Sequence, residues 1–115
     1  MDMDGIFETR KVLIQDEDHP EYYEILKGLE SNNTLSHKVV LFNDDKTPMV
    51  FVSWLYLYFQ DIEAREAEKR MMLVHETGSG ELLMTNRSLA ERIKAFVVSH
   101  ARNEGHPLRV EVHDI

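Results

Sequence analysis

The pattern of apolar and polar positions predicts three short strands. Residues 38–42 are almost all apolar, residues 81–85 form a short apolar segment, and residues 109–113 alternate between apolar and polar side chains. Between these segments apolar residues recur at every third or fourth position, which predicts helices. The resulting order, β-α-α-β-α-β, indicates the α+β class.

Capping residues predict where the first two helices begin. Thr47 is a good N-cap and Pro48 suits the first helical position, so a helix is expected over residues 47–60. Its β-branched and aromatic residues are also typical of a strand, and the Thr-Pro start favours the helix. Asp61 predicts the N-cap of the second helix, which is expected to end near His75.

A capping box and a terminal glycine predict the third helix. Ser88 is followed three residues later by Glu91, and Gly105 is a suitable C-terminal stop. The positions that recur at helical spacing between them are Leu89, Ile93, Phe96, Val97 and His100. This helix leads into the strand at residues 109–113.

The first 36 residues differ from the rest in charge. They contain nine acidic and three basic residues, so they carry six of the eight net negative charges of the chain. The polar residues 31–34 then separate them from the remainder of the chain. We expect residues 1–36 to form an acidic, partly disordered extension and linker, and residues 37–115 to form the core domain.

The extension also has apolar residues that could pack on the core. Residues 12–14 are compatible with an added edge strand, and the positions at helical spacing after Pro20 are Tyr22, Ile25, Leu26 and Leu29. The first core helix is apolar on nearly every side, and such a helix is normally covered. We therefore expect one of these segments to pack over Trp54 and Tyr58, with self-association as the alternative.

Composition excludes several classes of protein. Without cysteine there is neither a disulfide framework nor a thiolate nucleophile or metal ligand. A net charge of −8 argues against a nucleic-acid-binding surface and favours amine-bearing partners. No apolar run of about eighteen residues predicts a membrane span, and the acidic start lacks the features of a signal peptide. We expect a cytoplasmic protein.

An acidic turn at residues 43–49 joins the first strand to the first helix. It places the carboxylates of Asp44 and Asp45 and the amide of Asn43 beside the apolar side chains of Met49 and Val52. Such a site suits a cationic group attached to an apolar one, and the N-terminal residue of another chain is a ligand of this kind. The same acidic residues are also common in plain turns, because Asn and Asp bond to their own backbone.

Three separated segments closely resemble the ClpS family of ATP-dependent Clp protease adaptors. They are residues 38–52 (KVVLFNDDKTPMVFV), residues 71–75 (MMLVH) and residues 106–108 (HPL). The match is colinear from about His37 to Val112. It implies the ClpS-like fold, in which a small antiparallel three-stranded sheet is backed by three helices.

The resemblance also implies a function. ClpS proteins of bacteria bind substrates whose first residue is Leu, Phe, Tyr or Trp, and deliver them to a Clp AAA+ unfoldase of the ClpA or ClpC type. A similar chain is an adaptor without catalytic residues or cofactor, with substrate proteins and the unfoldase as its partners. Membranes and nucleic acids are not among them.

The same resemblance implies the site residues, position by position. Asn43, Asp44 and His75 are expected to hold the α-amino group of the substrate, while Asp45 and Thr47 shape the rim. The walls of the hydrophobic pocket are expected to be Met49, Val52, Leu55, Met71, Val74 and Leu108. Met49 matches the family residue that helps to exclude β-branched side chains.

Other interpretations of these residues stay open. A histidine that ends a helix commonly interacts with the last carbonyls and the helix dipole, and the apolar pocket residues would by default be core. An acid–base or metal site made of Asp44 or Asp45 with His75 is a weaker alternative, because metal sites normally need three or four ligands. A diverged module could also keep the fold and bind a partner through its aromatic first helix, without recognising N-terminal residues.

The chain departs from the family pattern at four further positions. Arg70 replaces an apolar residue near the pocket, and Leu83 stands where the family usually has glycine, which could remove a backbone kink. Ser88 and Ile93 replace the charged residues that ClpS proteins often use on the third helix for docking on the unfoldase. The identity of the unfoldase is therefore less well predicted than the class of ligand.

Overall fold

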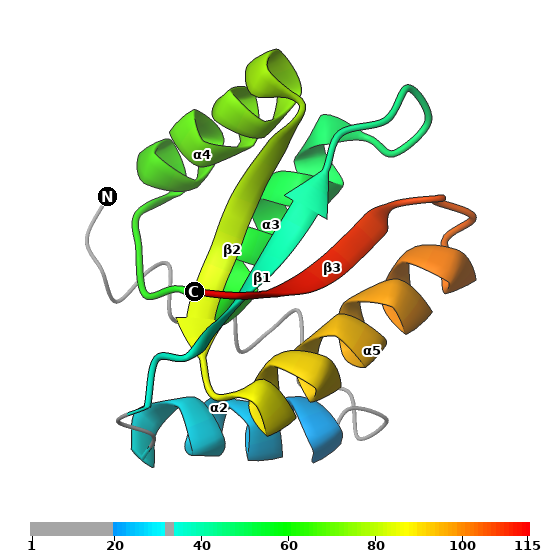
Figure 1. The fold of residues 1–115 in the computed structure, drawn as a ribbon. Helices are drawn as coiled ribbons and strands as arrows, with labels where there is room; N and C mark the ends of the chain where they lie inside the picture. The colour runs from blue at the N-terminus through cyan, green and yellow to red at the C-terminus, as the bar shows by residue number, and fades with distance from the viewer. Residues whose placement is uncertain (1–19, 32–33) are drawn as a thin grey trace.

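The computed structural model describes residues 20–31 and 34–115, and there the chain has four helices and three strands (Figure 1). In chain order these are α2 (Pro20–Ser31), β1 (His37–Phe42), α3 (Met49–Phe59), α4 (Ala64–Thr77), β2 (Ser79–Thr85), α5 (Arg87–Asn103) and β3 (Arg109–Asp114). The predicted α+β class and the β-α-α-β-α-β order of the core are confirmed. The strand considered for residues 12–14 lies outside the described residues.

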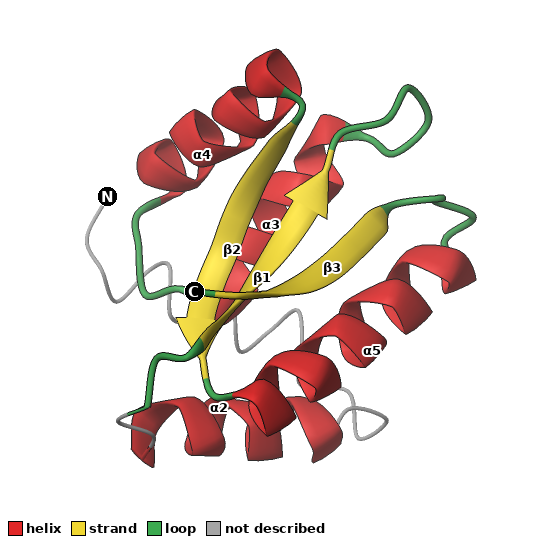
Figure 2. Ribbon diagram, viewed as in Figure 1, coloured by secondary structure: helices red, strands yellow, loops and turns green. Residues whose placement is uncertain are grey.

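The sheet has the strand order β2-β1-β3, and the central β1 is antiparallel to both neighbours. Figure 2 shows α3 crossing behind the sheet, with α4 and α5 on either side. Val39 and Leu41 of β1 are completely buried and Val40 between them is 7% exposed, whereas Lys38 and Phe42 are half-buried. Val39 and Leu41 point to the same face of the strand, and the core lies on that face. None of the helices in the described segments is long and apolar enough to cross a membrane.

The pairing of β1 with β2 contains one bulge, at which Leu82 is the extra residue. Two side chains, one from α3 and one from its C-cap residue, bond to the backbone there: the Tyr56 hydroxyl donates to the carbonyl of Glu81 at 2.8 Å, and the Gln60 amide donates to the carbonyl of Leu82 at 2.7 Å. Burial raises the pKa of Tyr56 to about 12, so its hydroxyl stays a donor. The strand thus keeps a backbone irregularity even though Leu83 stands in place of glycine.

Two helices begin later than predicted. The N-cap of α3 is Pro48 and not Thr47, because the backbone N–H and hydroxyl of Thr47 donate to Asp44 in the preceding turn. The N-cap of α4 is Glu63 and not Asp61. Neither cap makes a side-chain hydrogen bond. The packing of these helices, more than capping chemistry, determines where they start.

The start of α5 also differs from the prediction. Its N-cap is Asn86, whose side-chain oxygen accepts a hydrogen bond from the N–H of Leu89 at 2.8 Å. The predicted capping box of Ser88 and Glu91 is therefore wrong, since Ser88 already lies within the first turn. The predicted end is confirmed: the helix stops at Asn103, and Gly105 comes two residues later with a positive φ of 77°.

Helix α2 packs against the far end of α3 and against α5. Tyr22 and Ile25 are buried, and the Tyr22 hydroxyl donates to the backbone carbonyl of Tyr58. The Tyr22 ring lies 5.7 Å from that of Phe59 and 6.0 Å from that of Tyr58. The predicted contact of this segment with Tyr58 is thus confirmed, while Trp54 stays 40% exposed. The division of the chain after residue 36 remains a prediction.

Candidate functional site

A pocket lies where the end of β1, the start of α3 and the end of α4 meet. Its cavity volume is only about 10 Å³, within about 240 Å³ of empty space that includes open solvent. The lining residues are Phe42, Asn43, Asp44, Thr47, Met49, Val52, Met71, Val74, His75 and Leu108. Nine of the eleven residues expected from the sequence therefore meet in one pocket, although they come from separate segments of the chain.

The turn before α3 is organised by the carboxylate of Asp44. One oxygen accepts hydrogen bonds from the backbone N–H groups of Lys46, at 2.8 Å, and Thr47, at 2.6 Å. The other accepts from the Thr47 hydroxyl at 2.7 Å. A carboxylate has about four acceptor sites, so Asp44 can still accept a hydrogen bond from a ligand. Thr47 is buried and fixes Asp44 in place.

The same hydrogen bonds determine the charge of Asp44. Partial burial alone would raise the pKa of this carboxyl, but the hydrogen bonds from Thr47 and Lys46 lower it further than burial raises it. The charge of His106 also lowers the pKa of Asp44. The result is a pKa below the ordinary value of 3.8, so Asp44 is a carboxylate at neutral pH.

Asn43 and His75 are brought together by a backbone contact. The N–H of Asn43 donates to the carbonyl of Gly78 at 2.9 Å, which joins the turn to the end of α4. Gly78 ends α4 with a φ of 96°, in the left-handed region of backbone conformation that glycine adopts without steric strain. The side chains of Asn43 and His75 are exposed and hydrogen-bond to no residue within 20–31 or 34–115. Both are therefore available to a ligand.

Apolar side chains from α3, α4 and the residue before β3 form the floor and walls. Val52, Val74 and Leu108 are almost fully buried, whereas Met49 is 44% exposed at the mouth. Met71 lines the pocket from α4. Methionine side chains adapt to ligands of different outline, so the two methionines allow the pocket to change shape.

Two expected residues are not part of the lining. Leu55 lies one turn beyond Val52 on α3 and is 1% exposed, so it belongs to the core beneath the pocket. Asp45 is exposed and lies outside the lining, because Asp44 is the carboxylate of this turn that faces the pocket. Among the residues that the structure describes, Asp44 therefore supplies the single carboxylate of the pocket lining.

The sequence had not assigned a role to Phe42 or His106. Phe42 ends β1 and lines the pocket; its position directly before Asn43 is the only signal of this in the sequence. His106 lies close enough to Asp44 to affect its pKa, and its ring is 5.0 Å from the ring of Phe51. His106 belongs to a segment that resembles the family, yet neither spacing nor composition indicates what it contacts.

The donor set of the pocket does not fit a metal ion. In the parts of the chain that the structure describes, no three His, Cys, Asp or Glu side chains converge as metal ligands would. One carboxylate, one amide and one imidazole around an apolar pocket instead suit an organic cation with an apolar substituent.

Comparisons with known proteins identify related chains. The family model "ATP-dependent Clp protease adaptor protein ClpS" matches residues 32–111. A protein of Deinococcus radiodurans called ATP-dependent Clp protease adapter protein ClpS is 39% identical over 87 residues, which are 76% of this chain and 77% of that protein. The protein of the same name from Paraburkholderia xenovorans is 40% identical over 73 residues, or 64% of this chain and 70% of the other.

A solved structure shares the fold as well. The structure of Agrobacterium tumefaciens ClpS2 bound to L-phenylalaninamide superposes with a TM-score of 0.65 at 26% sequence identity. The similarity covers 70% of this chain and 98% of that one.

Proposed function

The chain belongs to the ClpS family of ATP-dependent Clp protease adaptors, and we propose that its pocket binds the N-terminal residue of substrate proteins when that residue is Leu, Phe, Tyr or Trp. As a member of this family it is an adaptor and not an enzyme. We propose that it delivers the bound substrate to a Clp AAA+ unfoldase. The observation that carries this proposal is the fixed carboxylate of Asp44 at the edge of an apolar pocket.

The ligand's α-amino group interacts with the polar side of the pocket. With an ordinary pKa of about 7.7 to 8.0, this group is mostly cationic at neutral pH. It donates to the carboxylate of Asp44 and to the side chains of Asn43 and His75, which have no other partner among the described residues. Each charge-assisted hydrogen bond contributes about 1.5 to 3 kcal/mol.

The ligand's side chain lies among the apolar walls. Burial of a Leu or Phe side chain contributes about 1.5 to 3 kcal/mol, so the total after the cost of association corresponds to a dissociation constant of about 1 μM. Met49 lines the pocket, is 44% exposed, and matches the family residue that helps to exclude side chains branched at Cβ. We therefore expect Ile and Val to be excluded.

Short peptides that differ only at their first residue test this proposal. We expect free Leu and Phe peptides to bind in the micromolar range by fluorescence anisotropy, and the Ile peptide to bind at least about tenfold more weakly. Acetylation of the Leu peptide removes the cation and should abolish binding, because the loss of a charge-assisted hydrogen bond leaves Asp44 unpaired. Equal binding of the acetylated and free peptides would refute the role of the carboxylate.

Binding should also depend on pH in a defined direction. Above about pH 8 the peptide's amine loses its proton, so the dissociation constant should rise about fiftyfold by pH 9.5. At the acid end, the pKa of Asp44 is lowered, so its carboxylate persists through neutral and mildly acidic pH and is lost only as the pH falls through that lowered value. Titrations between pH 6 and 9.5, with circular dichroism to verify folding, measure the alkaline effect; an unchanged affinity at pH 9.5 would exclude an ammonium ligand.

We predict that the unfoldase is of the ClpA or the ClpC type, and the sequence does not favour one over the other. Of the two positions at which this chain lacks the family's charged residues, Ile93 is completely buried and Ser88 is exposed. The side chain of Ile93 therefore cannot contact a partner. Docking through α5 would have to use other residues of that helix.

A further inference from the structure

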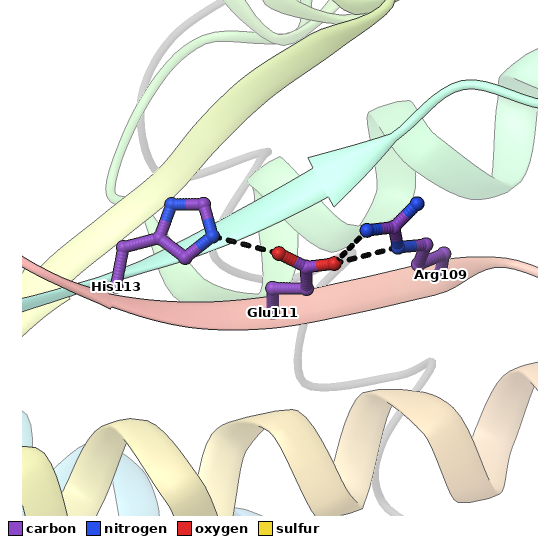
Figure 3. A network of polar contacts seen from close by, with 3 residues as sticks. All are labelled: Arg109, Glu111 and His113. Carbon is purple, nitrogen blue, oxygen red and sulfur yellow. Dashed lines mark hydrogen bonds and ion pairs between the residues drawn. The ribbon is translucent and has the colours of Figure 1, made fainter.

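Three charged or polar side chains form a row on β3. Arg109, Glu111 and His113 are at alternate positions and so lie on the same face of the sheet. Figure 3 shows the Glu111 carboxylate between the other two. One of its oxygens accepts from Arg109 Nε at 2.6 Å, and the other lies 2.8 Å from His113 Nε2. Glu111 therefore holds the guanidinium of Arg109 in position.

This row adjoins the pocket through Phe42. Phe42 pairs with Arg109 across β1 and β3, and the Arg109 guanidinium carbon lies 4.5 Å from the centre of the Phe42 ring. Phe42 lines the pocket, as does Leu108, the residue before Arg109. The positive charge thus lies beside the ring of a residue that lines the pocket. The Arg109 side chain is 67% exposed, so its charge acts on molecules that cross this rim.

The opposite charge lies at another part of the same rim. The turn with Asp44 and Asp45 approaches from the end of β1, and Asp44 is the proposed partner of the ligand's ammonium group. A substrate chain whose first residue occupies the pocket must leave across the rim. Successive Cα atoms are 3.8 Å apart, so its second and third residues stay within about 8 Å of the first.

We infer that Arg109 makes the adaptor sensitive to the charge of the residues after the first one, favouring Asp or Glu over Lys or Arg at the second and third positions of the substrate. This inference rests on the proposed function, since it requires the first residue to occupy the pocket. Two unit charges about 7 Å apart still interact at ordinary ionic strength, where the screening length is about 10 Å. Glu111 opposes the effect because it partly neutralises Arg109.

The test compares Leu peptides that carry Glu or Lys at position two, or at position three. The quantity measured is the ratio of the two dissociation constants, Lys peptide over Glu peptide. Arg109→Gln should lower this ratio about threefold at low salt, and Arg109→Lys should leave it nearly unchanged because the charge is kept. Glu111→Gln should raise the ratio by a similar factor, and 0.5 M salt should reduce both effects.

A matched control is another surface ion pair of an arginine with a glutamate. Arg92 on α5 lies 3.2 Å from Glu24 on α2, and neither residue lines the pocket. Arg92→Gln changes the net charge as Arg109→Gln does, so it should leave the ratio unchanged. An equal change in Arg92→Gln would mean that only the net charge of the protein matters.

The outcomes separate this inference from the proposal on which it rests. If Leu peptides bind and Arg109→Gln does not alter the ratio at either position, the role of Arg109 is refuted and the pocket keeps its proposed ligand. If no Leu peptide binds the unaltered protein, the proposed function fails, and the inference fails with it. A lowered ratio at one position only supports the inference and identifies the substrate residue that passes Arg109.

Discussion

Replacing Asp44 with alanine is expected to weaken the binding of a Leu peptide about a hundredfold. The substitution removes the carboxylate that pairs with the ammonium group, and loss of one partner of such a pair costs about 2 to 5 kcal/mol. It also removes three hydrogen bonds that fix the turn, two from Thr47 and one from Lys46. Fluorescence-anisotropy titration of the variant and the unaltered protein measures the change.

Asp45 provides a matched control in the same turn. Asp45→Ala removes the same charge one residue away, but Asp45 is exposed and lies outside the pocket lining, so we expect less than about a threefold change. Asp44→Asn keeps one oxygen for the backbone N–H groups but loses the charge and the second acceptor oxygen, to which the Thr47 hydroxyl donates, so its affinity should lie between those of the two alanine variants. Equal losses for Asp44→Ala and Asp45→Ala would show that only the general negative potential attracts the peptide.

The same variant distinguishes the proposed adaptor function from the alternative. A module that binds through α3 would use Val50 and Trp54, which are 54% and 40% exposed. These residues are not in the pocket lining, so Asp44→Ala would leave such binding intact. Loss of peptide binding in Asp44→Ala, with retained binding in Trp54→Ala, would assign recognition to the pocket.

The order of the elements was predictable because the strands have clear apolar runs and the helices have clear periodicity. Residues 38–42 and 109–113 were placed within one or two residues of β1 and β3. The helix starts were less predictable, because several capping residues stand close together in the sequence. Asn86 and Ser88 are both good N-caps, and the folded chain uses Asn86. Local chemistry permits both positions, and only the packing of the helix selects one.

The pocket residues that belong to the family's sequence motifs were predictable, and the other residues around the pocket were not. Asn43 and Asp44 are far from His75 in the chain, and the family resemblance, not composition, indicated that they meet. Phe42 and Arg109 could not be found in this way, because their neighbourhood depends on the register of β1 against β3. Leu55, which was expected in the pocket wall, lies one helical turn beyond Val52 and is 1% exposed, so one turn of α3 separates a residue that lines the pocket from a core residue. Such distinctions depend on side-chain depth, which a sequence pattern does not specify.

Replacing Tyr22 with alanine is expected to lower the free energy of unfolding by about 3 to 5 kcal/mol. Removing a buried aromatic side chain from a core has a cost of this size. Tyr22 is 1% exposed and packs against the rings of Tyr58, Phe59 and Phe96, and its hydroxyl donates to the carbonyl of Tyr58. Urea unfolding monitored by circular dichroism measures the loss.

The neighbouring Tyr23 is the control, because it has the same side chain on the same helix but is 46% exposed. Tyr23→Ala should cost less than about 1 kcal/mol, as surface substitutions usually do. A small cost for Tyr22→Ala as well would mean that α2, which precedes the part of the chain matched by the family model, is not part of the core's folding unit. Peptide affinity measured below the unfolding transition should not change, because α2 contacts the end of α3 opposite to Met49 and Val52. A stability effect without a binding effect would show that this helix supports the fold without contributing to the pocket.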